Sequence, residues 1–339
     1  MGAAAILLTL ALVLLAPGCG SETDTDTDAA PVDPAERRIQ AEEQTEQLAQ
    51  RFQAAAEHGG QLAPLIEEGH SLVQTFHDHP PAHLLLGQMY LAGQRGREAL
   101  KHARNSLEIE PDQPEVQLIA GSIAFNLQEY ALAQEHYELA VRFNPTAGRP
   151  RLHLARAYIH QNQYELALQE LLEALRLDSS LYQAHAALAD LYARQNKLTL
   201  AVDQIQRALE MVPDDQEEHH TLYLREYARF LRRLNQPADA LDVLRQLPPR
   251  QTFEPEVIEE LAACWAMLGQ PELAAAQYEQ ARILDPTDPD FAAGAAQWHL
   301  RARNVNGAQR AIDELHRLNS QDPRLADLRT QLQRVSRGD

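Results

Sequence analysis

Four arginines in the second half of the chain are spaced so that they could bind an anionic group together: Arg225, Arg229, Arg232 and Arg233. The spacing i, i+4, i+7 and i+8 places them along one stripe of a helix. A guanidinium group binds a carboxylate through two parallel hydrogen bonds. We therefore treat this arginine stripe as a candidate binding surface for an acidic peptide or a C-terminal carboxylate.

Histidines form two dense groups, one between His77 and His83 and one at His219-His220. Neither group has the spacing of a zinc site, such as paired cysteines or a helical His-Glu-x-x-His. The chain also lacks a Gly-rich phosphate loop, a Gly-x-Ser-x-Gly elbow and a Cys-x-x-Cys-His haem motif. The sequence therefore favours incidental surface histidines, and it predicts no metal site, no cofactor and no catalytic residue.

Alanine recurs at intervals of 34 residues, at Ala99, Ala133, Ala167 and Ala201 and again at Ala240, Ala274 and Ala308. Alignment on these alanines divides the chain into seven repeats: 80–113, 114–147, 148–181, 182–215, 221–254, 255–288 and 289–322. Five extra residues, 216–220, separate the fourth repeat from the fifth. A period of this length is typical of stacked helix-turn-helix units, none of which can bury its apolar face alone. The sequence therefore predicts an elongated all-α array.

Other positions recur in the same register. The first repeat has Leu86-Gly87-Gln88-Met89-Tyr90 before Ala99 and ends at Pro111, and the fourth has Leu188-Ala189 before Ala201 and ends at Pro213. These residues resemble the tetratricopeptide repeat (TPR) family. The resemblance implies a right-handed superhelical solenoid of about seven helix-turn-helix repeats with a helical cap at each end. Thr252 and Ser320 replace the closing proline, so we expect the fifth and seventh repeats to be distorted.

Small residues occupy one position in the first helix of every repeat, opposite the recurring alanines of the second helix. They are Gly87, Gly121, Ala155, Ala189, Ala228, Ala262 and Ala296. Small side chains allow two helices to approach closely, so we expect the tightest packing at these positions.

In tetratricopeptide arrays the first helix of each repeat lines a concave groove, and the resemblance places the arginine stripe of the fifth repeat there. The third repeat adds Arg149, His153, Arg156 and His160, and the fourth adds Arg194. Arg156 and His160 have the same offsets as Arg229 and Arg233, and Arg194 also matches Arg233. These nine residues are the candidate partner-binding residues of a non-catalytic protein-interaction scaffold.

A purely structural interpretation of the same arginines stays open. Glu256, Glu259 and Glu260 of the sixth repeat could neutralise part of the arginine stripe. The cluster in the third repeat has fewer acidic neighbours, with Glu115 as the obvious one. Runs of charge are commonly solvated faces, so the sequence leaves both a binding role and a pairing role possible.

Both ends of the repeat array have sequences typical of caps, which a solenoid needs to cover its terminal faces. Residues 37–79 read as a degenerate helical pair, with helices at about 35–58 and 61–77 separated by Gly59-Gly60. Residues 323–339 read as a C-terminal capping helix with many charged residues.

The N-terminus begins with an apolar run, Ala3 to Leu15, followed by Ala16-Pro17-Gly18-Cys19. The run is too short for a membrane span of about 20 residues but suits a signal peptide. Residues 1–19 resemble a bacterial lipoprotein signal, which implies that Cys19 is lipidated. The resemblance and the following Gly20-Ser21 imply a location at the outer membrane, facing the periplasm. An uncleaved anchor or an ordinary secretory signal remains the alternative.

Residues 20–36 combine acidic residues with Thr, Ala and Pro and contain no Lys or Arg. Such a composition favours an acidic, disordered tether. The whole chain carries a formal net charge of −19, which argues against general binding of nucleic acids. With Cys19 lipidated, Cys264 has no partner, so no disulfide is predicted.

The repeats leave no room for a catalytic domain within the 339 residues. The sequence therefore predicts a membrane-tethered scaffold of the bacterial cell envelope that binds a peptide or helix of an envelope protein. One alternative is a structural spacer that associates with itself, and another is an accessory subunit of an envelope enzyme or assembly machine. The identity of the partner and the oligomeric state stay open.

Overall fold

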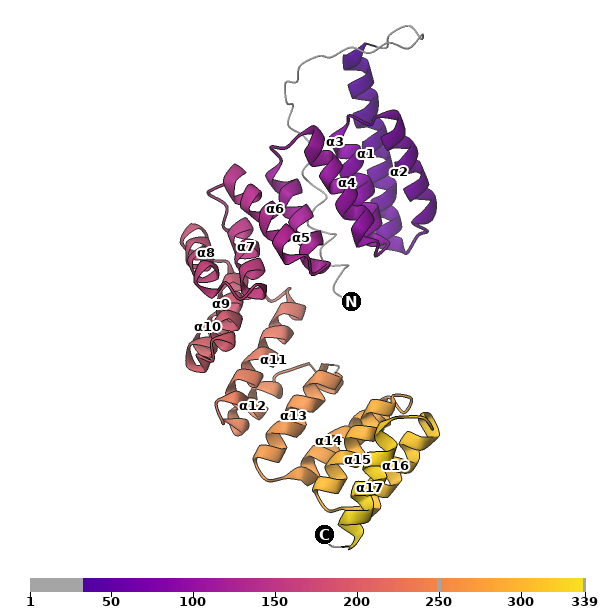
Figure 1. The fold of residues 1–339 in the computed structure, drawn as a ribbon, viewed down its shortest axis with the longest axis vertical. Coiled ribbons are helices and arrows are strands. Elements are labelled where there is room, and N and C mark those ends of the chain that lie inside the picture. Colours follow the sequence, from indigo (N-terminus) through magenta and orange to yellow (C-terminus); the bar gives the residue numbers. More distant parts are fainter. Residues whose placement is uncertain (1–32, 249–250, 338–339) are drawn as a thin grey trace. The chain divides into compact units, whose positions relative to one another are not determined.

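The computed structural model describes residues 33–248 and 251–337, and within these ranges it contains seventeen α-helices and no strand. They fall into two compact units divided after Ser179, which we call the N-terminal body and the C-terminal body (Figure 1). The predicted signal peptide, Cys19 and most of the predicted tether lie outside the described residues. No described helix is both long enough and apolar enough to cross a membrane.

The N-terminal body contains the predicted N-terminal helical pair and three helical hairpins. Its helices are α1 (Pro34–His58), α2 (Ala63–Thr75), α3 (Pro80–Ala92), α4 (Gly96–Ile109), α5 (Pro114–Asn126), α6 (Tyr130–Phe143), α7 (Gly148–His160) and α8 (Tyr164–Leu177). Consecutive helices pack against each other throughout this body. The all-α solenoid fold predicted from the sequence is confirmed.

The C-terminal body contains four further hairpins and a final helix. Its helices are α9 (Tyr182–Arg194), α10 (Leu198–Met211), α11 (Glu217–Arg233), α12 (Pro237–Leu244), α13 (Pro255–Met267), α14 (Pro271–Leu284), α15 (Pro289–Arg301), α16 (Val305–Leu318) and α17 (Arg324–Arg337), with a 3₁₀ turn, η1, at Gln251–Phe253. In α17, Leu325, Leu328 and Leu332 are buried against α15 and α16. The helix thereby covers the last hairpin.

The turn inside every repeat has the same backbone geometry. The fifteenth residue of each repeat has a positive φ between 55° and 72°: Gln94, Gln128, Asn162, Asn196, Asn235, Gly269 and Arg303. A left-handed residue here ends the first helix and reverses the chain. Only one of the seven is glycine, so the turn could not be located from glycine alone.

The seven recurring alanines of the second helices are all 0% exposed. The small residues opposite them are buried too, and a Cβ on Gly87 would lie 3.2 Å from the carbonyl oxygen of Ala99. The small residues therefore allow the close helix contact that their spacing predicted. Bulky side chains such as Leu86 and Tyr137, almost fully buried, fill the space beside these contacts.

A polar pair joins the two helices in each of the first four repeats, between the fourth residue of the first helix and a residue nineteen positions later. The pairs are His83–His102 (3.4 Å), Gln117–His136 (2.8 Å), Arg151–Glu170 (2.8 Å) and His185–Gln204 (2.9 Å). In the fifth and seventh repeats the same positions hold buried apolar residues, Leu224 with Val243 and Ala292 with Ala311.

Two local expectations can be compared directly with the helices. The fifth repeat is distorted, because α12 has 8 residues where the other second helices have 14. The expected distortion of the seventh repeat was wrong, since α15 and α16 have 13 and 14 residues. There the Asp322 carboxylate accepts a hydrogen bond from the backbone N–H of Arg324 at 2.9 Å and caps the next helix without the missing proline.

The other correction concerns the end of the acidic tether, which was predicted at residue 36. Helix α1 already begins at Pro34, and the Asp33 carboxylate accepts a hydrogen bond from the backbone N–H of Ala35 at 3.1 Å. A proline in the first turn preceded by a capping aspartate favours helix initiation. Four of the five residues inserted before the fifth repeat, 217–220, extend α11, which begins at Glu217 after its N-cap residue Gln216.

Candidate functional site

The arginine stripe lies on α11, where it is largely paired with carboxylates of the C-terminal body. Arg225 bonds Glu254 at 3.0 Å, and it approaches Glu256 at 3.9 Å. Arg232 bonds Glu260 at 2.6 Å, and Arg229 approaches the same carboxylate at 3.5 Å. These contacts join α11 to α13 and to the residue preceding it, as the pairing interpretation proposed.

Two further acidic residues form ion pairs with arginines of this surface. Arg229 bonds Glu226 at 2.9 Å within α11, and Arg194 bonds Asp190 at 3.0 Å within α9. Burial raises the pKa of the Glu226 carboxyl, although Arg229 opposes the shift. Four arginines of this surface, Arg194, Arg225, Arg229 and Arg232, therefore already have internal carboxylate partners, and an external carboxylate would have to compete with them.

Arg233 differs from the rest of the stripe. Its guanidinium donates to the backbone carbonyl of Ala193 at 3.2 Å and reaches the side-chain oxygen of Asn196 at 3.5 Å. Among the residues that the structure describes, it forms no ion pair with a carboxylate. It thus connects α11 to the end of α9 and brings Arg194 and the stripe onto one surface.

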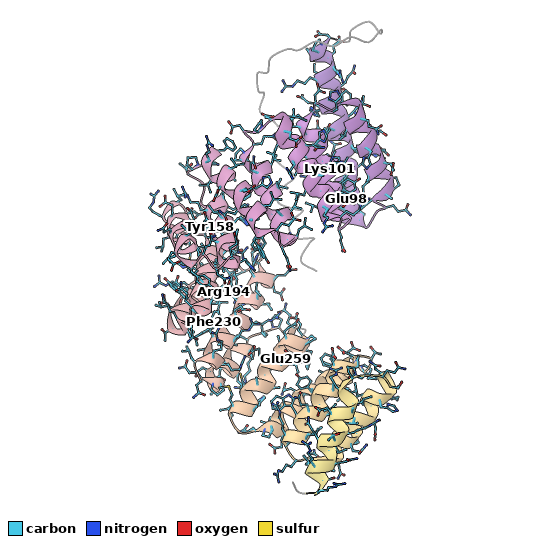
Figure 2. The ribbon with its side chains drawn as sticks, in the orientation of Figure 1. Glu98, Lys101, Tyr158, Arg194, Phe230 and Glu259 are labelled. Carbon is cyan, nitrogen blue, oxygen red and sulfur yellow. The ribbon has the colours of Figure 1, made fainter. Side chains whose placement is uncertain are left out.

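That surface contains an open depression of about 300 Å³, and Figure 2 labels two of the residues that line it, Arg194 and Phe230. Its lining consists of Asp190, Ala193, Arg194, Glu226, Arg229, Phe230 and Arg233. Three guanidinium groups and two carboxylates surround one aromatic ring, so the depression is polar and nearly neutral. Such a surface suits a peptide side chain better than a small apolar ligand.

The cluster of the third repeat lies on α7 in the N-terminal body. Arg149 and Arg156 are exposed, and within the described part of the chain neither forms an ion pair. The neighbouring Arg151 is the one that pairs, with Glu170 at 2.8 Å. Arg149 and Arg156, like Arg233, can therefore accept an external carboxylate without losing an internal one.

The two histidines of this cluster have different environments. His160 is exposed, stacks on Tyr130 with ring centroids 4.6 Å apart and meets the edge of Phe125 at 5.0 Å. His153 packs against Tyr137. Burial, helped by Arg156 and Arg149, lowers the pKa of His153 to about 3. His153 is thus uncharged at neutral pH and offers no positive charge to a ligand.

Sequence reasoning missed several partners of these residues. Asp190 precedes Arg194 by four residues and Glu226 precedes Arg229 by three, which are helical pairing distances that could have been recognised. Glu254 lies just outside the acidic residues considered, whereas Glu259 forms no ion pair with any described residue. Phe125 and Tyr130 belong to the preceding repeat, and no spacing in the sequence indicates that their rings contact His160.

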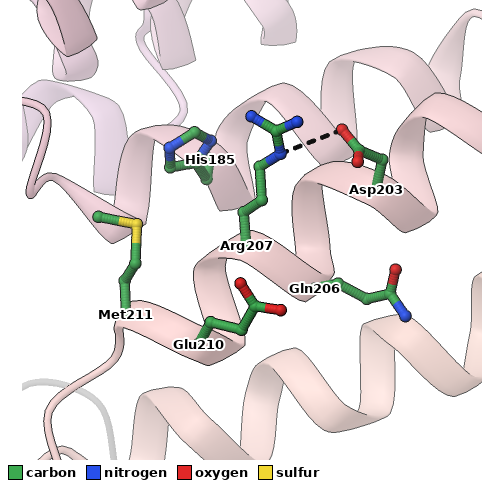
Figure 3. Close-up of a pocket in the computed structure, with 6 residues that line it drawn as sticks. All are labelled: His185, Asp203, Gln206, Arg207, Glu210 and Met211. Atoms are coloured by element: carbon green, nitrogen blue, oxygen red, sulfur yellow. Dashed lines mark ion pairs between the residues drawn. The ribbon is translucent and has the colours of Figure 1, made fainter.

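A second open depression, of about 470 Å³, lies in the fourth repeat (Figure 3). It is lined by His185 of α9 and by Asp203, Gln206, Arg207, Glu210 and Met211 of α10. The charges are paired internally, with Arg207 and Asp203 3.2 Å apart, and His185 bonds Gln204. The lining does not combine a nucleophile with a base.

The described residues contain no group of three or more His, Cys, Asp or Glu arranged to hold a metal ion. Cys264 is buried, and burial raises the pKa of its thiol to about 11. A thiol of that kind is a poor nucleophile at neutral pH. The described surfaces present charged and aromatic side chains that can bind a partner.

Comparisons with known proteins bear on the repeats. The sequence model of the tetratricopeptide repeat family matches residues 78–148 and 152–216. No curated protein matches the chain. Among solved structures, a tetratricopeptide repeat protein from Parabacteroides merdae is 16% identical, with a TM-score of 0.56, over 72% of this chain and 94% of that one.

A second solved structure, PilF from Pseudomonas aeruginosa, is 15% identical with a TM-score of 0.52, and the match covers 66% of this chain and 98% of that one. At these identities the likeness concerns the fold alone. Proteins built from tetratricopeptide repeats generally mediate protein–protein interactions. The predicted tetratricopeptide repeats are thus confirmed in the two matched stretches, 78–148 and 152–216.

Proposed function

We propose that this protein is a non-catalytic scaffold, tethered to the bacterial cell envelope by a lipid on Cys19, that binds an acidic peptide segment of an envelope protein. The observation that carries the binding role is the pair of exposed arginines on α7, Arg149 and Arg156, neither of which is paired with a described carboxylate. On the same helix, His160 stacks on Tyr130 and meets Phe125 at a near right angle, which adds a cluster of aromatic rings. A peptide with a carboxylate next to an aromatic or aliphatic side chain fits both.

The paired arginines of α11 are less suited to this role. Arg232 and Arg229 share Glu260, so a ligand carboxylate there replaces an existing interaction and contributes little net free energy. Unpaired arginines bear no such cost. We therefore assign binding of the acidic segment to α7.

Charge reversal on α7 tests the binding surface. In fluorescence anisotropy with labelled peptides rich in Asp, Glu and aromatic residues, we expect Arg149→Glu/Arg156→Glu to weaken binding at least tenfold, because two attractive contacts become repulsive. Peptides with Asn and Gln in place of the acids should bind weakly to both proteins. Arg310→Glu/Arg329→Glu, with the same change of charge on exposed residues of α16 and α17, is the matched control. Equal affinity of the α7 variant and the control would exclude this surface.

The tether is tested separately, by growing cells with a radioactive or clickable fatty acid. We expect the wild-type protein to carry the label and to fractionate with membranes. Cys19→Ser should lose the label and move to the soluble fraction, because a lipid-modified cysteine is the proposed anchor. A Cys264→Ser control should behave as wild type. Membrane association of Cys19→Ser without label would instead identify an uncleaved N-terminal anchor.

Self-association is the second candidate function, and exposed leucines on second helices favour it. Leu166 and Leu172 of α8 are 44% and 54% exposed, and Leu200 of α10 is 45% exposed. Sedimentation velocity at increasing protein concentration distinguishes the two functions. A sedimentation coefficient that rises with concentration, and no longer does so in Leu166→Gln/Leu172→Gln, would establish the spacer.

A further inference from the structure

Helix α4 carries a row of basic residues that the proposed function does not use. Arg97, Lys101 and Arg104 follow the spacing i, i+4 and i+7 and are all exposed (Figure 2 labels Lys101). The opposite side of the helix, with Ala99, His102 and Ala103, is buried. The three residues therefore form one outward-facing row, which we call the α4 basic row.

The α4 basic row is unusual among the second helices of the repeats. The same three positions hold Ala131, Glu135 and Glu138 in α6, Glu165, Gln169 and Leu172 in α8, Thr199, Asp203 and Gln206 in α10, Ala238 and Asp242 in α12 with Arg245 directly after it, Glu272, Ala276 and Glu279 in α14, and Asn306, Arg310 and Asp313 in α16. No other second helix has more than one basic residue at these positions. The row therefore does not follow from the repeat pattern.

Nor do carboxylates of the described residues neutralise the row. Glu98, the acidic residue next to Arg97, is bound by Arg95 at 2.7 Å instead. In the described part of the chain, none of the three basic side chains forms an ion pair. In a chain with a net charge of −19, three adjacent unpaired cations attract an acidic partner.

We propose that the acidic segment Glu22–Asp28 of this same chain binds the α4 basic row. The segment has an acid at every second position, Glu22, Asp24, Asp26 and Asp28, with no basic residue. In an extended chain such residues point to one side at intervals of about 6.6 Å. The basic residues are spaced along the α4 axis by about 6 Å and 4.5 Å, so successive charges can meet.

The position of the segment in the chain makes the contact intramolecular. The segment is joined to α1 at Pro34, and Arg37 in the first turn of α1 donates to the backbone carbonyl of Thr75 at the end of α2, 3.1 Å away. Helix α1 also packs against α3, the hairpin partner of α4 (Figure 1). The twelve residues 22–33 can span at most about 40 Å, roughly twice the 21 Å length of α4.

A tethered segment has an effective concentration in the millimolar range, which an external acidic peptide or an anionic lipid must exceed. Binding of the segment shortens the distance between residue 19 and the first repeat. It also shields the α4 basic row from other acidic partners. Because the contact is exposed, salt should weaken it.

The lysine content of the chain allows a direct test, because Lys101 and Lys197 are the only lysines. A carbodiimide joins a lysine amine to a carboxylate only where the two are in contact. In the full chain, purified in detergent at low salt, we expect Lys101 to be linked to Glu22, Asp24, Asp26 or Asp28 at least ten times more often than Lys197, as counted by mass spectrometry. The links should fall several-fold in 0.5 M NaCl.

Variants that keep the reporter lysine complete the test. Arg97→Glu/Arg104→Glu should reduce the Lys101 links at least fivefold, whereas the control Arg310→Glu/Arg329→Glu should leave them unchanged. Links from Lys101 to Glu98, Glu108 or Glu135 alone would overturn the proposal. So would links found mainly between copies in a mixture of ¹⁴N- and ¹⁵N-labelled protein. Vesicles containing phosphatidylglycerol that bind the wild type through the α4 basic row, with no link to the segment, would identify a lipid as the occupant instead.

Discussion

Replacing Gly121 by alanine should destabilise the second repeat by about 2 kcal/mol, although alanine is intrinsically the better helix former. A Cβ at this position would lie 2.6 Å from two atoms of the Tyr137 ring. Tyr137 is 1% exposed, so its ring has no space into which it can move. The added methyl group must therefore push α5 away from α6.

Urea unfolding followed by circular dichroism measures the loss, and hydrogen exchange of α5 and α6 localises it. Gly93→Ala is the matched control, because a Cβ there would lie 3.6 Å from the closest atoms, an ordinary contact distance. It should change the free energy of unfolding by less than about 0.5 kcal/mol. In the background of Tyr137→Leu, Gly121→Ala should cost less than it does alone. An equal cost in both backgrounds would rule out the ring contact as the cause.

We also expect a low pH to destabilise the first repeat strongly. His83 and His102 are buried with their Nδ1 atoms 3.4 Å apart, and the ring of His70 lies 6.1 Å from that of His102. His83 donates its Nε2–H to the carbonyl of His77, so its Nδ1 accepts from His102. Protonating this pair brings charge into a buried, water-poor space.

Burial, with His83, His70 and Lys101 adding to it, lowers the pKa of His102 to about 4. Burial also lowers the pKa of His83 and of the adjacent His79, where Glu42 and Asp78 oppose the shift and Arg38 adds to it. An unfolded histidine titrates near 6.5. The unfolded chain therefore binds more protons below that pH, so stability is complete above pH 6.5 and falls as the pH drops towards 4. For His102 alone the loss at pH 5 is on the order of 2 kcal/mol.

His102→Gln is the sharp test, because it converts the His–His pair into the His–Gln pair that the fourth repeat already has in His185–Gln204. The variant should fold at pH 7 and lose less stability than the wild type between pH 7 and pH 5, measured by urea unfolding at each pH. His220→Gln, at an exposed histidine, should follow the wild-type profile. If His102→Gln also follows the wild-type profile, this pair does not cause the acid sensitivity.

The repeat fold could be predicted because its determinants are steric and periodic. Ala99 and its six equivalents leave room for only a small partner, and a 34-residue spacing can be read directly from the chain. The missing proline at Ser320 was misleading because Asp322 begins the next helix in another way. A backbone cap formed by a single carboxylate has a weaker sequence signal than a proline.

The candidate site was less predictable, because an offset in a repeat does not determine which charges a side chain reaches. Arg229 and Arg232 converge on one carboxylate, Glu260, while Glu259 pairs with no arginine among the described residues. Arg149 and Arg151 are two residues apart, yet Arg151 alone is paired. Which arginine pairs with which carboxylate depends on how each helix is rotated and how far each side chain reaches. An alignment of the repeats gives neither.

The polar pairs that join the two helices of the first four repeats have a consequence for how the chain assembles. A repeat protein has many similar hairpins, so a first helix could in principle pack against the second helix of another repeat. Such an exchange would place Arg151 opposite a histidine, or Glu170 opposite Gln117, and leave a charged side chain in the helix interface without its partner. The charged Arg151–Glu170 pair therefore opposes exchange of the third repeat's helices with those of other repeats, at the same positions where the fifth and seventh repeats rely on apolar packing alone.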